Sequence, residues 1–319
     1  MSALLGGLAQ LLHLALMLAL APLLVGMIRL VKARLLGRRG PPLLQPWRDI
    51  LRLARKQPVV ADGASLVFFH APAVILAATI AVAALVPGFA LGMTSAPLAD
   101  LLLIAGLLGL GRAVLALAGM DIGTAFGGIG ASREMTFAVF AEPVMLLVIF
   151  VLALLAGTTN LDAIALTLHD FSLGLRVSLG LALVATLALA IAENGRIPID
   201  NPSAHLEVTM VHEAMVLEYS ARHLALIEMA AALKLLVWFT LIGTIFAPFT
   251  AALPGAGPLA WLSGLLGWLG KVAVLGLALA AFETGIAKMR VFQVPEFLGV
   301  ALLLALLAVV FLFVSQSFA

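Results

Sequence analysis

Residues 4–31 read LLGGLAQLLHLALMLALAPLLVGMIRLV, and residues 32–56 read KARLLGRRGPPLLQPWRDILRLARK. The first stretch is apolar over at least the roughly 20 residues that a membrane-spanning helix needs. The second, together with Arg29, carries nine of the chain's 18 lysines and arginines. Dense positive charge beside an apolar run marks the cytoplasmic end of a span. Because the charge follows the run instead of preceding it, we expect a retained first span and not a signal peptide.

The composition places the whole chain in a lipid environment. Its 319 residues are 64% hydrophobic and 11% charged, with a mean hydropathy of +1.20. A net charge of +2 would fit nucleic acid, but half of the basic residues adjoin one span, so anionic headgroups are the expected partner and nucleic acid is not. The absence of cysteine excludes disulfides, thiolate zinc sites and cysteine-ligated iron–sulfur clusters within the chain. We therefore expect no metal site and no cofactor of its own.

Apolar runs predict an all-α, polytopic membrane protein in which residues 1–319 form a single membrane domain. The eight expected spans are 4–31, 66–92, 98–119, 134–156, 174–192, 223–249, 258–282 and 296–316. Most of the basic residues fall in or beside the connections 32–65, 120–133, 193–222 and 283–295. By the positive-inside rule, these four connections are cytoplasmic and both termini are outside.

The basic connection 32–65 contains a short amphipathic pattern at 46–56. One helical face would carry Trp47, Ile50, Leu51 and Ala54, with basic residues around the rest. This pattern is typical of a helix that lies in the headgroup plane. A plain basic loop is the alternative.

Several ionisable residues fall inside or at the edge of expected spans, where each costs about 2.5–3.5 kcal/mol on insertion scales. They are Glu142, Glu228, Lys234, Lys271 and Glu283. Such groups face a bundle interior or water and have partners, so we expect them to line a proton or ion path. Purely structural pairing between helices is the alternative.

The connection 193–222 is acidic. With the next span it places six carboxylates between positions 193 and 228: Glu193, Asp200, Glu207, Glu213, Glu218 and Glu228. Crowded carboxylates near a membrane interior have raised and coupled pKa values, which suits proton uptake. A solvated acidic loop is the alternative.

Two segments resemble known site motifs, but each lacks a residue or element that its motif requires. His212-Glu213 lacks a second histidine, because Val216 stands where a zinc protease motif would need it. Gly127-Gly128-Ile129-Gly130 has no phosphate-binding lysine and no strand signal before it. We expect this glycine-rich segment to form a membrane re-entry or a tight turn.

Four segments together resemble the subunit-1 family of respiratory complex I, and more closely its branch in membrane-bound nickel–iron hydrogenases of the formate hydrogenlyase type. They are RRGP at 38–41 with QPWRDI at 45–50, GASRE at 130–134 with Glu142-Pro143, ENGRIPID at 193–200 with EYS at 218–220, and ETGIAKMR at 283–290. They occur in the family's order over most of the chain, and eight spans is the family's number.

The resemblance implies a non-catalytic anchor and coupling subunit of an energy-converting hydrogenase complex in a prokaryotic plasma (inner) membrane. Implied partners are hydrogenase large and small subunits, a ferredoxin-like iron–sulfur subunit and antiporter-like membrane subunits, so that the iron–sulfur clusters and the nickel–iron site belong to partners. The implied acidic funnel comprises Glu134, Glu142, Glu193, Asp200, Glu207, Glu213, Glu218 and Glu228; Lys234, Lys271 and Glu283 complete the expected proton path. Docking of the soluble arm is expected at Arg38, Arg39, Arg48, Asp49, Arg133 and Arg196.

One segment departs from the family pattern. The family's Asp-Leu-Pro-Glu-Ala-Glu-x-Glu stands here as DNPSAHLE at 200–207, so Ser203 and His205 replace two carboxylates. In complex I that loop borders the quinone chamber, which puts quinone reduction in doubt. A quinone-pocket subunit of complex I remains the same-family alternative. A free-standing ion-coupled transporter is the other, although the chain shows no internal repeat of the kind that many transporters have.

Overall fold

The computed structural model describes residues 3–61, 63–169, 177–197, 211–286 and 293–317. Within these ranges the chain is helical, with no strand beyond isolated bridges. Asp200 and Glu207 of the expected proton path lie outside the described residues.

Each of the eight expected spans corresponds to one helix: α1 (Ala3–Leu35), α3 (Leu66–Leu85), α4 (Leu101–Asp121), α5 (Ala125–Ala156), α7 (Val177–Glu193), α10 (Ala221–Phe246), α11 (Pro258–Gly285) and α12 (Val294–Ser317). Seven of these helices are long and apolar enough to cross a membrane, and α7 is a shorter apolar helix of 17 described residues. The prediction of an all-α polytopic membrane protein is confirmed.

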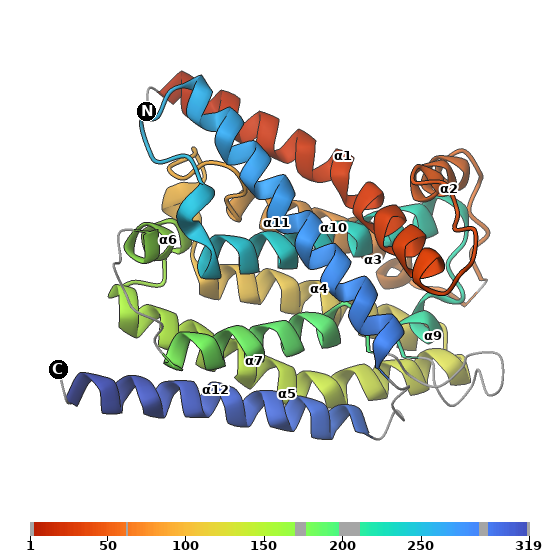
Figure 1. Cartoon of the computed structure of the whole chain (residues 1–319). Helices are drawn as coiled ribbons and strands as arrows, with labels where there is room; N and C mark the ends of the chain where they lie inside the picture. Colours follow the sequence, from red (N-terminus) through yellow and green to blue (C-terminus); the bar gives the residue numbers. More distant parts are fainter. Residues whose placement is uncertain (1–2, 62, 170–176, 198–210, 287–292, 318–319) are drawn as a thin grey trace.

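The eight helices run between two opposite ends of the molecule, and α10 is at their centre. Figure 1 shows both termini at the same end, with α2 and α9 (His212–Val216) at the other. We call the end with the termini the outer end, as the charge pattern predicts. Every residue of α10 from Leu235 to Ile245 is buried, whereas α11 and α12 are buried along one side only. α10 therefore positions the helices that carry the charged groups.

The expected interfacial helix is present as α2 (Gln45–Ala54). Figure 1 shows it almost end-on, roughly across the direction of α1. Trp47 Nε1 donates to the carbonyl of Ala19 at 3.0 Å, and Pro46 is buried against α1. Leu51, on the other edge of the expected apolar face, is exposed. One edge thus packs on the bundle and the other is open to headgroups, as an interfacial helix requires.

The expectation of a turn at Gly127–Gly130 is wrong, because these residues form the first turns of α5. Thr124 caps that helix, its Oγ1 accepting from the Gly127 amide at 3.3 Å. Gly127 packs on the carbonyl of Gly119, and a Cβ on Gly130 would lie 2.8 Å from the Val211 carbonyl oxygen. The missing side chains let α4, α5 and α9 approach closely. The expected connection 120–133 is therefore reduced to residues 122–124.

Candidate functional site

The sequence Glu193-Asn-Gly-Arg196 ends α7 in a way that fixes two charged side chains. Gly195 has φ +59°, the left-handed conformation that favours glycine. Its amide donates to the Ala192 carbonyl at 3.0 Å, and the Arg196 amide donates to the Ile191 carbonyl at 2.9 Å. This is the Schellman pattern of a helix C-terminus. It holds Glu193 in the last turn, inside the bundle, and turns Arg196 toward the inner face.

Glu193 meets an arginine from another span. Arg112 lies within α4, and its guanidinium forms an ion pair with Glu193. The same guanidinium is 3.9 Å from Glu134 and 3.6 Å from Glu142, both on α5. The side chains of Arg112 and Glu193 are only 8% and 5% exposed. Three carboxylates from two helices therefore converge on one buried cation.

Lys234 of α10 supplies a second cation. Its ammonium donates to a carboxylate oxygen of Glu193 at 2.9 Å and to the carbonyl of the same residue at 2.8 Å. We call Arg112, Glu134, Glu142, Glu193 and Lys234 the intramembrane charge cluster. With every group ionised it holds three negative and two positive charges, so one proton would neutralise it.

The cluster reaches the side of the bundle at Glu142. This side chain is 61% exposed although it lies near the middle of α5, beyond the reach of either helix end. Around it, α4 and α5 present exposed apolar side chains such as Leu110, Val139 and Leu146. A carboxylate exposed at this depth needs a polar or protonatable neighbour. Of the two expected surroundings, the bundle interior or water, Glu142 meets the interior at its contact with Arg112 and is otherwise exposed.

A second group of charges lies at the inner end of the bundle. Glu283 near the end of α11 forms an ion pair with Lys32 of α1, and its other oxygen is 3.7 Å from Arg196. The Glu283 side chain is only 6% exposed. Burial lowers the pKa of Arg196, and the charge of Glu283 opposes that shift. This inner-end cluster joins the start of the basic connection to the segment that follows Glu193.

The basic and acidic connections also meet at a second place. The Ser220 hydroxyl accepts from the Val59 amide at 2.9 Å and donates to the Val59 carbonyl at 3.0 Å. The Tyr219 hydroxyl, whose pKa is raised by burial, donates to the carbonyl of Phe68 at 2.9 Å. The two connections therefore form one inner surface. On it, Arg38, Arg39 and Arg48 of the expected docking set are exposed.

Other residues of the expected proton path lie apart from the ion pairs of the two clusters. Glu213, Glu218 and Glu228 are exposed at the inner end, and the charge of Glu228 also acts on Arg196. Lys271 lies deep in α11 and donates to the Gly243 carbonyl at 3.2 Å. Within the described ranges, no three His, Asp or Glu side chains are placed to hold a metal ion. Arg112 is the cluster residue that sequence reasoning did not select. A lone arginine inside an apolar helix, directly after Gly111, was its only signal.

Comparisons with known proteins agree with this architecture. Formate hydrogenlyase subunit 4 of Escherichia coli (strain K12) is 34% identical over 87% of this chain and 89% of that protein. Hydrogenase-4 component C of the same strain is 34% identical over 92% of each chain. NADH-quinone oxidoreductase subunit 8 of Rhodothermus marinus is 30% identical over 75% of this chain and 72% of that protein.

A solved structure of a membrane-bound sulfane sulfur reductase, an archaeal respiratory membrane complex, contains a chain with the same fold. The TM-score is 0.75 at 21% identity, covering 96% of this chain and 98% of that one. The model of the family described as NADH dehydrogenase matches residues 8–314. This chain therefore belongs to the NADH dehydrogenase family, as a multi-pass membrane member similar to formate hydrogenlyase subunit 4 and hydrogenase-4 component C.

Proposed function

We propose that this chain is the membrane-anchor and coupling subunit of a multisubunit, energy-converting hydrogenase complex similar to formate hydrogenlyase. Two relatives at 34% identity that match most of the chain are named formate hydrogenlyase subunit 4 and hydrogenase-4 component C, which supports the proposal. In this account, the chain holds no redox cofactor. Iron–sulfur clusters and a nickel–iron site belong to hydrogenase large and small subunits and to a ferredoxin-like subunit. In the same account, the complex lies in a prokaryotic inner membrane.

The observation that carries the coupling role is the convergence of three carboxylates on the buried Arg112. The intramembrane charge cluster has one carboxylate more than it has cations, so it can accept and release a proton without leaving a large unbalanced charge. Glu193 and Glu134 would receive protons from the inner side. Glu142, at the side of α5, would pass them to a neighbouring antiporter-like membrane subunit.

A conservative substitution at Glu142 tests this function. In liposomes containing the purified complex, Glu142→Gln should reduce proton movement about tenfold or more, because a positioned acid–base group typically contributes about 10²–10⁴-fold to a proton-transfer step. Soluble electron transfer to an artificial acceptor should stay at the wild-type rate. Glu296→Gln is the matched control, since Glu296 is an exposed carboxylate in the first turn of α12. Wild-type proton movement in the Glu142 variant would rule out its role in the route.

Docking of the soluble arm makes a separate prediction. Arg39→Ala and Arg48→Ala each remove an exposed positive charge from the inner surface. Because exposed charge pairs are screened by salt, the arm should leave variant membranes at lower ionic strength than wild-type membranes. The measurement is the hydrogenase activity that remains on washed membranes across a salt series. Arms retained equally by both variants and the wild type would contradict this docking role.

A further inference from the structure

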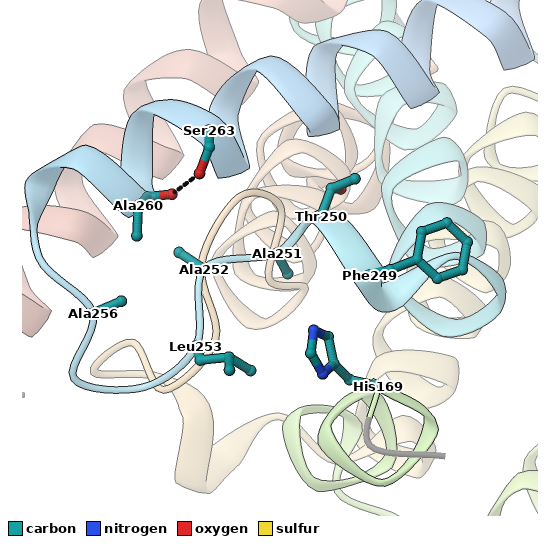
Figure 2. Close-up of a pocket in the computed structure, with 9 residues that line it drawn as sticks. All are labelled: His169, Phe249, Thr250, Ala251, Ala252, Leu253, Ala256, Ala260 and Ser263. Carbon is teal, nitrogen blue, oxygen red and sulfur yellow. Dashed lines mark hydrogen bonds between the residues drawn. The ribbon is translucent and has the colours of Figure 1, made fainter. Parts of the chain in front are cut away.

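The outer end of the bundle contains an open cavity that the proposed function does not use. Figure 2 shows His169 of α6 (Leu161–His169) projecting into it, opposite Thr250 and Ser263. The other lining residues are Phe249, Ala251, Ala252, Leu253, Ala256 and Ala260. The volume is about 470 Å³. Since a water molecule occupies about 30 Å³ in the liquid, the cavity has room for on the order of ten waters.

One polar group of the cavity wall is turned toward the bundle. The Oγ1 atom of Thr250 is buried and has no hydrogen-bond partner among the described residues. Gly267 of α11 lies directly beside it, and a Cβ built on Gly267 would overlap the Thr250 side chain. A buried hydroxyl without a protein partner is an expected position for an ordered water. Thr250 and Gly267 therefore pack against each other at the inner end of the cavity, and we call this contact the neck.

Lys271 lies one helical turn beyond this neck, four residues after Gly267. Side chains on a helix lean toward its N-terminus, which for α11 is the outer end. Lys271 thus extends back toward Gly267. It is 13 residues from Pro258, so its Cα is about 20 Å along the helix from that end, too deep for the side chain to reach the outer end of the bundle directly, and the residue is partly exposed.

The ammonium of Lys271 has a partner that suits a cation. Its Nζ donates at 3.2 Å to the carbonyl of Gly243, which lies in the last turn of α10. Carbonyls at a helix C-terminus lack partners within the helix and carry partial negative charge. Gly243 also leaves space for the Lys271 side chain, because a Cβ at position 243 would lie 3.2 Å from Lys271 Cδ. The Lys271 ammonium therefore has a carbonyl at the end of α10 as its partner, and among the described residues it forms no ion pair with a carboxylate.

We propose that this cavity is an outward-facing water vestibule that ends at Lys271, and that Lys271 exchanges protons with the outer side through it. The ammonium would release a proton to vestibule water, and the neutral amine would take up a proton from the inner side. Lys234 lies on the same α10 helix, nine residues before Gly243, or about 14 Å inward. The inference deepens the proposed coupling function and rests on it for the role of the proton, but the vestibule itself is a separate structural claim.

Single cysteines test the vestibule cleanly, because the chain has none of its own. The variants are Ser263→Cys in the cavity, Lys271→Cys at its proposed end, and Leu266→Cys on the exposed apolar side of α11 as the control. Each is made in the full complex, in membranes of known orientation. A charged, membrane-impermeant methanethiosulfonate is applied from the outer side. Since thiol reactivity requires access and ionisation, Lys271→Cys should react about tenfold or more faster than Leu266→Cys.

Equal, slow labelling of Lys271→Cys and Leu266→Cys would overturn the vestibule. Adding Thr250→Leu should block the neck, which slows labelling at position 271 while labelling of Ser263→Cys continues and shows that the fold is intact. The proton role is measured separately with Lys271→Gln, which should lower proton movement while electron transfer continues. Wild-type proton movement in that variant would overturn the role of Lys271. Labelling needs no turnover, so its failure would leave the coupling role of the intramembrane charge cluster standing.

Discussion

Arg112→Leu should destabilise the chain more than any other single substitution in the clusters. It removes the cation that three carboxylates share and leaves Lys234 as the only counter-charge of the intramembrane charge cluster. Breaking a buried ion pair by removing one partner costs about 3–5 kcal/mol, because the remaining charge stays buried. We expect a large loss of assembled complex from the membrane and a lower thermal midpoint for what remains.

Arg52→Leu is the matched control for that substitution. Arg52 pairs with Asp49 on the surface of α2, and its side chain is 68% exposed. Exposed pairs contribute about 0–1 kcal/mol, so this variant should assemble like the wild type. Arg112→Lys should recover part of the loss, because lysine keeps the charge but lacks the planar fork that contacts several carboxylates at once. Equal stability of the Arg112→Leu and Arg52→Leu variants would contradict the central position of Arg112.

The second large effect is expected from Glu193 and Lys234, which can be removed together. Glu193→Gln alone leaves the Lys234 ammonium without its carboxylate, and Lys234→Met alone leaves Glu193 with Arg112 as its remaining cation in the cluster, so each single variant should be destabilised. The double variant removes both charges and should regain much of the stability, which a double-mutant cycle measures. Proton movement should nevertheless fall about tenfold or more, because the titrating carboxylate is absent.

This combination separates structure from function. If Glu193 served only to hold α7 against α10, restoring stability would restore proton movement. If it carries the proton, the double variant is stable, binds the soluble arm and transfers electrons, but does not move protons. Recovery of both properties together would assign the Glu193–Lys234 pair to structural pairing between helices.

The membrane architecture follows from the sequence because lipid imposes a simple rule. Every span must be a long apolar helix, so apolar length alone locates α1 and α4 to within four residues and the start of α3 at Leu66, although the expected end at 92 lies seven residues beyond Leu85. The amphipathic pattern of α2 is equally local and was predictable for the same reason. The helical structure of the glycine-rich start of α5 was not predictable in this way. Its residues favour turns on their own, but close packing on α4 and α9 makes them helical.

The candidate site is harder to predict from the sequence, because its charged residues are brought together only by the packing of helices that are distant in the chain. Depth in a span correctly singled out Glu142 and Lys234 as unusual, but it did not show which residues meet. Arg112 is separated by 81 positions from Glu193 in the chain, and only the packing of α4 against its neighbours brings them together. Crowding along the sequence does not show this pairing either, since Glu213, Glu218 and Glu228 are exposed at the inner end, apart from Glu193.

The most direct test of the coupling account is the number of protons moved per electron pair in liposomes that contain the purified complex with both Glu193→Gln and Lys234→Met. The account predicts a stable complex that still transfers electrons to an artificial acceptor and moves almost no protons. A wild-type ratio of protons to electrons in that variant would contradict the claim that the intramembrane charge cluster carries the proton.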